Sequence, residues 1–390
     1  MDFSLTEEQQ LLKQSVRGFL EVEIAPQVSE YEAKGPMTRE DAISFIKMLM
    51  PFGYYNGRAP EDLGGSDLDV KTAGLLIEEL SRVWAALAGV VFIAGPAAVP
   101  AMLSDADQRE FRDRVRAGES IGSGGISEPD HGSDSSRLET RAVLDGDEWV
   151  INGTKTWISN GPIADHINLN VTIDPEAGRE GLRTVYVDRE TSPYQTVRHN
   201  NLLGCRAWPN GELHFDGVRV PRQNLRGRGG ASGETAQPTK RVWNFDSPRS
   251  TLAAMSVGIA QASIDASIAY AQERHQFGRP IGSFQLVQEL IVDSVIETEC
   301  ARLLTYQALD MQDRGEDASW QAAAAKAYAT EMAIRVTSRA IEVHGGVGLM
   351  EDYPLERYFR DARTLTIPDG TTEIQKLVIG RRLLGISAIS

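Results

Sequence analysis

This sequence contains few cysteines and histidines, and its acidic residues outnumber its basic ones. The chain of 390 residues has only two cysteines, Cys205 and Cys300, which excludes a disulfide framework, and we interpret both as packing residues. The six histidines show no metal-ligand spacing, so we expect no protein-bound metal. The net charge of −15 argues against a nucleic-acid partner, because phosphate groups bind to cationic surfaces.

Long hydrophobic runs are also missing. The apolar stretch from Ala85 to Val99 is interrupted by Gly89, Gly95 and Pro96 and is too short to cross a bilayer. The first residues lead directly into charged sequence, without the basic and apolar regions of a signal peptide. We therefore expect a cytoplasmic protein that has no membrane partner.

The composition is that of an ordinary globular protein, with 41% hydrophobic and 24% charged residues, and the length favours two or three packed units. Helical periodicity dominates the first part of the chain, where Thr6 and Gln9 form a predicted capping box. A second apolar helix is predicted over residues 72–90. We interpret its acidic pair, Glu78 and Glu79, as part of a solvated face.

The pattern changes to strands and turns between Ile121 and about residue 225. Asp145-Gly146 and Asn152-Gly153 are both strong hairpin signals. Apolar and polar residues alternate in the later part of this region, as they do in half-buried strands. A barrel-like or sandwich-like β-domain is therefore expected in the middle of the chain.

Helical periodicity returns after a loop at residues 226–243 that is rich in glycine, proline and charge. Long helices are predicted over residues 249–274, 284–313, 318–343 and 371–384, consistent with a four-helix bundle. The predicted fold class is α+β. Its predicted domains are an N-terminal helical domain (1–120), a middle β-domain (121–235) and a C-terminal helical bundle domain (236–390).

Four segments resemble motifs of the acyl-CoA dehydrogenase family and follow the family's order. They are GISEPDHGSD (125–134), RHQFGRPIGSFQ (274–285), EVHGGVGLMEDYPLERYFRD (342–361) and DARTLTIPDGTTEIQ (361–375). The chain thus resembles a divergent member of that family. The resemblance implies the family's fold, an FAD cofactor and α,β-dehydrogenation of an acyl thioester. In that reaction a carboxylate takes the α proton while the β hydrogen leaves as hydride to flavin N5.

The resemblance also implies a set of FAD-binding residues. They are Ile126, Ser127, Gly132, Ser133, Trp157, Ile158, Ser159, Arg274, Phe277, Gln285, Glu342, Gly345, Gly346, Thr371 and Glu373. In the family, the equivalents of Arg274 and Gln285 reach the FAD of a neighbouring subunit, which implies a homodimer or homotetramer. Arginine suits phosphate oxygens, and adjacent glycines allow a cofactor to approach the backbone. Taken alone, Arg274 would be interpreted as a surface charge and Trp157 as a core residue. Gly345 and Gly346 would be interpreted as a helix C-cap.

Substrate binding and catalysis are assigned by the same resemblance. The implied substrate-binding residues are Ser133, Phe245, Asp246, Arg249 and Gly370, although Asp246 with Ser247 can equally cap a helix. Asp369 is the implied catalytic base. Family members usually have glutamate there, and the alternative position for the base is occupied by Pro248, which cannot serve. Taken alone, Asp369-Gly370 is an ordinary turn dipeptide, and His131 is a competing candidate for proton removal.

Departures from the family pattern bear on the substrate. They are Asp369 in place of glutamate, His131 and Arg137 near the flavin loop, Trp208-Pro209 in place of Ser-Asp, and the longer loop 226–243. We therefore expect an acyl-CoA or acyl-carrier-protein substrate other than a plain straight-chain fatty acyl group. An electron-transfer flavoprotein is the candidate electron acceptor.

Two other functions remain open at this stage. One is a flavin oxidase of the same fold that acts on another acidic C–H bond with oxygen as acceptor, and the other is an inert structural relative. The loop cations, Arg226, Arg228, Lys240 and Arg241, are predicted to help select an anionic carrier, with a solvated surface loop as the alternative.

Overall fold

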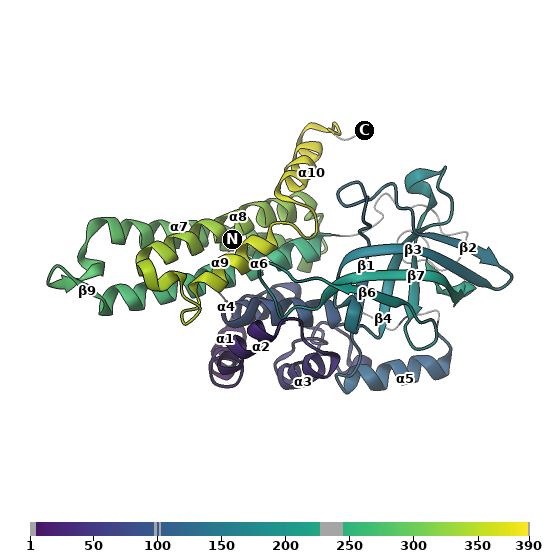
Figure 1. Ribbon diagram of the computed structural model, residues 1–390, viewed down its shortest axis with the longest axis horizontal. Coiled ribbons are helices and arrows are strands. Elements are labelled where there is room, and N and C mark those ends of the chain that lie inside the picture. Colours follow the sequence, from purple (N-terminus) through teal and green to yellow (C-terminus); the bar gives the residue numbers. More distant parts are fainter. Residues whose placement is uncertain (1–4, 97–99, 101–102, 227–244, 389–390) are drawn as a thin grey trace.

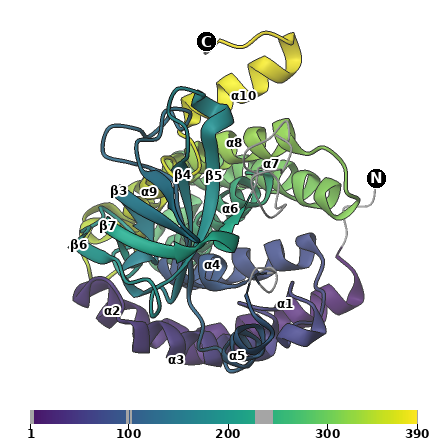
Figure 2. The same cartoon turned by 90° about the vertical axis from the view of Figure 1, so that its right-hand side faces the viewer.

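The computed structural model describes residues 5–96, 100, 103–226 and 245–388. The strands form a sheet at one end of the molecule, and the long C-terminal helices extend from it to the other end (Figure 1). Viewed from the sheet end, the N-terminal helices lie on one side of α4 and the C-terminal helices on the other (Figure 2). Helix α4 is therefore the layer that joins the two helical parts.

The N-terminal helices are α1 (Glu7–Phe19), α2 (Val28–Lys34), α3 (Arg39–Leu49), α4 (Val70–Ala94) and α5 (Asp105–Arg116). The strands of the sheet are β1 (Gly122–Gly125), β2 (Arg141–Asp145), β3 (Glu148–Ser159), β4 (His166–Thr172), β5 (Leu182–Asp188), β6 (Gln195–His199), β7 (Asn210–Pro221) and β8 (Leu225–Arg226). The C-terminal elements are α6 (Asp246–Glu273), β9 (His275–Gln276), β10 (Arg279–Pro280), α7 (Gln285–Asp313), α8 (Ser319–His344), α9 (Leu355–Leu365) and α10 (Thr372–Leu384).

The predicted capping box is present at the start of α1. The Thr6 hydroxyl accepts from the Gln9 N–H, and the Gln9 side chain accepts from the Thr6 N–H, both at 3.1 Å. These bonds satisfy backbone donors that the first helical turn leaves unpaired. The local prediction of this helix start is confirmed.

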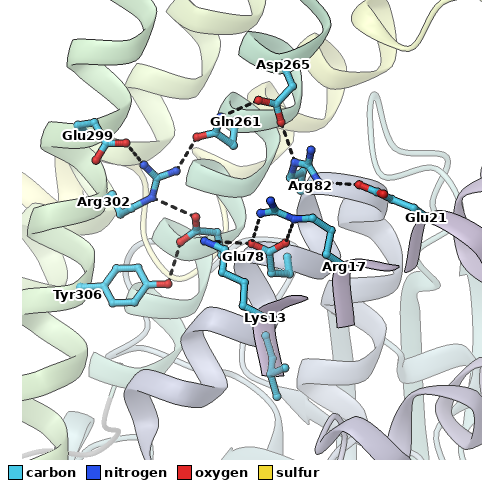
Figure 3. Close-up of polar contacts among 12 residues, drawn as sticks. Lys13, Arg17, Glu21, Glu78, Arg82, Gln261, Asp265, Glu299, Arg302 and Tyr306 are labelled. Carbon is cyan, nitrogen blue, oxygen red and sulfur yellow. Dashed lines mark hydrogen bonds and ion pairs between the residues drawn. The ribbon is translucent and has the colours of Figure 1, made fainter. Parts of the chain in front are cut away.

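The interpretation of Glu78 and Glu79 as a solvated face is wrong, because both residues are buried. Helix α7 covers one of them: Glu78 accepts from Arg302 at 3.1 Å and from Tyr306 at 2.9 Å. Helix α1 covers the other, since Arg17 donates twice to Glu79 at 2.9 Å. Figure 3 shows these cations lying on opposite sides of the α4 acids. The pair links α4 to both neighbouring helices.

Eight strands form one mixed sheet within the described residues, in the order β6-β7-β3-β2-β4-β5-β8, with β1 paired to β4. Asp145-Gly146 makes the predicted hairpin between β2 and β3, with Gly146 at φ 63°. Asn152-Gly153 does not make a turn. It lies inside β3 at an irregularity in the pairing with β7, where the Asn152 side chain accepts from the Gly217 N–H at 2.8 Å.

The three long helices α6, α7 and α8 pack against one another around a core rich in alanine. The predicted α+β fold of helices, sheet and helical bundle is confirmed. One further helix, α9, was not predicted. Its inner face consists of Leu355, Ala362 and Leu365, together with the acid Asp361. A charged residue on the buried face weakens the apolar stripe by which a helix is recognised.

Helix α6 is the one helix of the described chain that is long and apolar enough to span a membrane, but 72% of its apolar window is buried inside the fold. Core helices of soluble proteins have the same property. The cytoplasmic location stays a prediction. Of the two cysteines, Cys205 is buried as expected, whereas Cys300 is exposed and is not a packing residue.

Candidate active site

The segment between α9 and α10 carries the predicted base. Asp369 and Gly370 both have left-handed backbone conformations, with φ values of 54° and 94°. A Cβ atom on Gly370 would lie 2.8 Å from the side-chain nitrogen Nε2 of Gln375, so the segment needs glycine there. A non-glycine residue at positive φ is strained, and its surroundings must hold it in place.

Three side chains from three helices hold this segment through its carbonyl groups. Lys326 on α8 donates to Thr366 O at 2.9 Å and to Gly370 O at 2.5 Å. Gln375 on α10 donates to Asp369 O at 3.0 Å and to Gly370 O at 2.6 Å. A longer contact of 3.5 Å joins Arg249 Nε on α6 to Asp369 O. The backbone around the predicted base is thus fixed from several sides.

The backbone carbonyl of Asp369 accepts hydrogen bonds, but its side-chain carboxylate receives no hydrogen bond or ion pair from the described part of the chain. Burial raises the pKa of Asp369, and the positive charges of Lys326 and Arg249 oppose that shift. Burial also lowers the pKa of Lys326 to about 8. A desolvated carboxylate with a raised pKa is suited to proton abstraction near neutral pH.

The predicted substrate residues at the start of α6 lie beside this base. Arg249 is buried, and its guanidinium carbon lies 5.2 Å from the centre of the Phe245 ring. Asp246 is the first residue of the helix, whereas the N-cap position belongs to Phe245 and makes no side-chain capping bond. The structure therefore brings Phe245, Arg249 and Gly370 together with Asp369.

Helix α9 fixes this region to the β-domain. The Asp361 carboxylate accepts from the Cys205 N–H at 2.5 Å, and the Thr364 hydroxyl accepts from the Gly204 N–H at 3.1 Å. These backbone donors belong to the segment between β6 and β7. Trp208 in the same segment is buried, and its ring packs at Gly89 of α4. Its indole lies inside the fold.

The end of β3 carries the predicted flavin wall. Trp157 has a left-handed φ of 61° and is 58% exposed, while the next residue, Ile158, is buried. Asn160 anchors the turn to α4 by donating to Val90 O at 2.9 Å. Ser127 lies alongside, since its carbonyl accepts from the Thr156 N–H at 2.9 Å. A strained backbone that presents a large bare indole suits a flat cofactor.

A buried ion pair holds the neighbouring loop, residues 126–140. Lys155 donates to Ile126 O at 2.9 Å and to Glu128 at 2.8 Å, and Glu128 also accepts the N–H groups of Glu139 and Thr140. Gly132 and Ser133 are exposed on this loop. His131, the competing candidate base, faces Glu139 at 3.5 Å.

Thr371 and Glu373 lie at the start of α10, directly after Asp369 and Gly370, whereas six other predicted cofactor residues lie at the far end of the bundle. The β9–β10 hairpin stands at the opposite end of the molecule from the sheet (Figure 1). Phe277 at its tip is 93% exposed, and the packing of Val343 against Ile281 brings the end of α8 to the same place. The exposed predicted residues there are Arg274, Phe277, Gln285, Glu342, Gly345 and Gly346. One chain therefore does not bring these residues together with Trp157.

Some residues of the site were not predicted from the sequence. Lys326 and Gln375 hold the base segment, and Lys155 and Glu128 hold the flavin loop. A signal exists for Lys326, which is the single charged residue in the run AAAAKAYA. Its partners are backbone carbonyls about 40 positions further along, and no side-chain pattern marks them.

The chain is similar in sequence and fold to known proteins. Family models match the chain over three consecutive regions: the acyl-CoA dehydrogenase N-terminal domain over residues 6–114, the middle domain over 123–218 and the C-terminal domain over 241–384. A probable acyl-CoA dehydrogenase of Bacillus subtilis, YngJ, is 35% identical over 98% of this chain and 100% of its own length.

Two solved structures are similar over nearly the whole chain. One, from work on the electron transferring flavoprotein of Acidaminococcus fermentans, has a TM-score of 0.89 and 31% identity, covering 98% of this chain and 100% of that one. The other is a glutaryl-CoA dehydrogenase from Mycobacterium smegmatis in complex with FADH2, with a TM-score of 0.86 and 26% identity, covering 99% and 97%.

The fold and these matches define a flavoprotein oxidoreductase whose cofactor is FAD. More specifically, the chain belongs to the acyl-CoA dehydrogenase family.

Proposed function

We propose that this enzyme introduces an α,β double bond into an acyl thioester, with Asp369 as the base that removes the α proton. The Asp369 carboxylate carries this proposal. It accepts no hydrogen bond from the described chain, its pKa is raised by burial, and it lies beside Arg249 and Phe245 at the predicted substrate position. The departing proton moves to the carboxylate, and the electron pair of that C–H bond forms the new C=C bond.

FAD, when bound, supplies the acceptor for the β hydrogen and its electron pair. In this proposal Trp157, Ile158, Ser159, Ile126 and Ser127 form the flavin wall, joined by Gly132, Ser133, Thr371 and Glu373. The 58% exposed indole of Trp157 supports this role, because a large apolar side chain left bare near the end of strand β3 is suited to stacking. The task of the protein is to orient the thioester between this wall and the base.

A second copy of the chain completes the site in our proposal. Arg274, Phe277, Gln285, Glu342, Gly345 and Gly346 would bind the FAD of the partner, as a homodimer or homotetramer requires. Helix α7, which begins beside them, supports this arrangement. Its exposed apolar residues Leu286, Val292, Ile296 and Leu303 form a surface that one chain leaves uncovered.

The substrate and acceptor are narrower proposals. Aspartate is one methylene shorter than the usual glutamate, so the substrate must lie closer to the base or have a more acidic α C–H. The carrier is CoA or a carrier protein. Residues 227–243 of the predicted carrier-selecting loop lie outside the described residues, and Arg226 belongs to strand β8. The likeness to a protein studied with an electron transferring flavoprotein supports such an acceptor.

The deciding experiment is anaerobic flavin reduction, measured by bleaching, with a panel of acyl-CoAs and acyl-carrier proteins. Asp369→Asn should bind FAD and substrate but fail to bleach. Asp216→Asn, which neutralises an exposed acid of the β-domain, is the matched control and should behave like the wild type. Bleaching of Asp369→Asn at the wild-type rate would refute the assignment and direct the test to His131.

A further inference from the structure

Lys326 is a buried cation that the proposed reaction does not use directly. Its side chain is 0% exposed, although alanines surround it on α8 and an alanine there would avoid the desolvation of an ammonium group. The ammonium group donates to Thr366 O and Gly370 O, one on each side of Asp369. A cation kept inside an alanine-rich core must offset its desolvation with these bonds.

The bonds of Lys326 act on the strained part of the base segment. Asp369 and Gly370 both have positive φ, and Gln375 donates to the carbonyl groups of the same two residues. The Gln375 side chain donates hydrogen bonds from a neutral amide group. Lys326 adds a positive charge that lowers the pKa of the Asp369 carboxylate against the effect of burial. Its contribution to the site is therefore both geometric and electrostatic.

We propose that Lys326 is the positioning residue of the base: its ammonium group fixes the backbone on both sides of Asp369 and adds a positive charge to the surroundings of the carboxylate. This inference rests on the proposed role of Asp369.

The charges around Lys326 come from three helices. They are Asp369 before α10, Glu373 on α10, Arg249 on α6 and Glu331 on α8 itself. Removing the Lys326 charge should raise the pKa of Asp369, because Lys326 is the larger of the two cationic influences that lower it. The base would then become protonated at a higher pH, and the acidic limb of the rate profile would move upward. The pKa of Lys326, lowered to about 8, places its own charge loss on the basic side.

The test compares Lys326→Met with Lys155→Met. Lys155 is the matched control, because it is also 0% exposed, also donates to a loop carbonyl and also has its pKa lowered to about 8. Flavin reduction by an acyl-CoA substrate is followed against pH, together with FAD content and hydrogen exchange of residues 366–371. Lys326→Met should move the acidic limb up by about one pH unit, slow reduction about tenfold or more at neutral pH and speed exchange of the segment. Lys155→Met should leave the position of the limb unchanged.

Lys326→Gln separates the two contributions, since it keeps a donor and removes the charge. We expect its limb to move while exchange of the segment stays nearer to the wild type. An unmoved limb in either folded variant overturns the proposal. If neither variant folds, Lys326→Arg decides, since it keeps the charge and a donor: the proposal expects its acidic limb at the wild-type position, and a limb moved upward overturns the proposal. Activity in Asp369→Asn would instead refute the proposed base, which is a separate result.

Discussion

Two buried lysines of this molecule each have a carboxylate in their surroundings, and the pKa values of these two carboxylates are shifted in opposite directions. Lys155 and Lys326 are both fully buried, and each holds a loop by its carbonyl groups. Glu128 contacts Lys155 directly at 2.8 Å, whereas the Asp369 carboxylate makes no ion pair with Lys326 within the described chain. The two sites therefore differ in whether the lysine ammonium group contacts the carboxylate directly.

The pKa shifts of the two acids follow from that difference. Burial would raise the pKa of Glu128, but Lys155 and two backbone N–H groups outweigh it, so its pKa is lowered. Burial dominates at Asp369, and its pKa is raised. A neutralised pair stabilises the fold, while an acid left without direct partners is available for chemistry. The contrast can be tested at each carboxylate in turn.

The largest expected effect is on the reaction rate. Asp369→Asn should slow flavin reduction by about 10²- to 10⁴-fold, because the proposed base is lost. It should unfold at the same or a higher temperature, since the ionised Asp369 is disfavoured by burial. Stopped-flow bleaching and thermal unfolding together measure this. A large fall in stability with little loss of rate would make Asp369 another structural acid.

The next effect is on stability, at the other pair. Glu128→Gln leaves the buried ammonium of Lys155 without its carboxylate and should cost about 3–5 kcal/mol. The double variant Glu128→Gln/Lys155→Met should cost less, because the uncompensated charge is also removed. Denaturant unfolding of both variants gives the comparison. Equal losses would mean that the pair does not act as a unit.

A smaller effect is expected from the length of the base. Asp369→Glu should lower the rate with the native substrate by up to about 10²-fold, because the carboxylate moves by about one bond length. Plain acyl-CoAs assayed in parallel are the comparison substrates, and we expect a smaller loss or a gain with them. A uniform change over all substrates would show that Asp369 does not set the substrate position.

The smallest expected effect is the pH dependence of stability. Glu128 has a folded pKa below its ordinary value of 4.5, so its contribution is present above that pH and is lost as pH falls through the folded pKa. Wild-type stability should therefore fall more steeply than that of Glu128→Gln between about pH 5 and 3. Parallel curves in denaturant would contradict the lowered pKa.

Local signals predicted the local structure well. The capping box of Thr6 and the hairpin at Asp145-Gly146 depend on residues a few positions apart, and both formed as expected. Asn152-Gly153 failed as a hairpin because its partner, Gly217, comes from a strand far along the chain. Motif resemblance predicted the family and the residues around Asp369.

Charge placement was harder to predict. The burial of Glu78 depends on which helices pack on α4, and a single helix does not encode that. Lys326 was not predicted, although it is the lone cation in an alanine-rich run. Its function became apparent only when the carbonyl groups of a later segment were placed next to it. Contacts of this kind depend on tertiary packing rather than on periodicity.

The distance between the two ends of the bundle has a genetic consequence under the proposed two-chain site. A chain with Arg274→Ala and a chain with Asp369→Asn would each be inactive alone. In a mixed dimer, one site would combine the intact Asp369 of one chain with the intact Arg274 of the other, and the second site would carry both defects. Coexpression of two dead variants should then restore part of the activity, so the two mutations would complement each other as alleles.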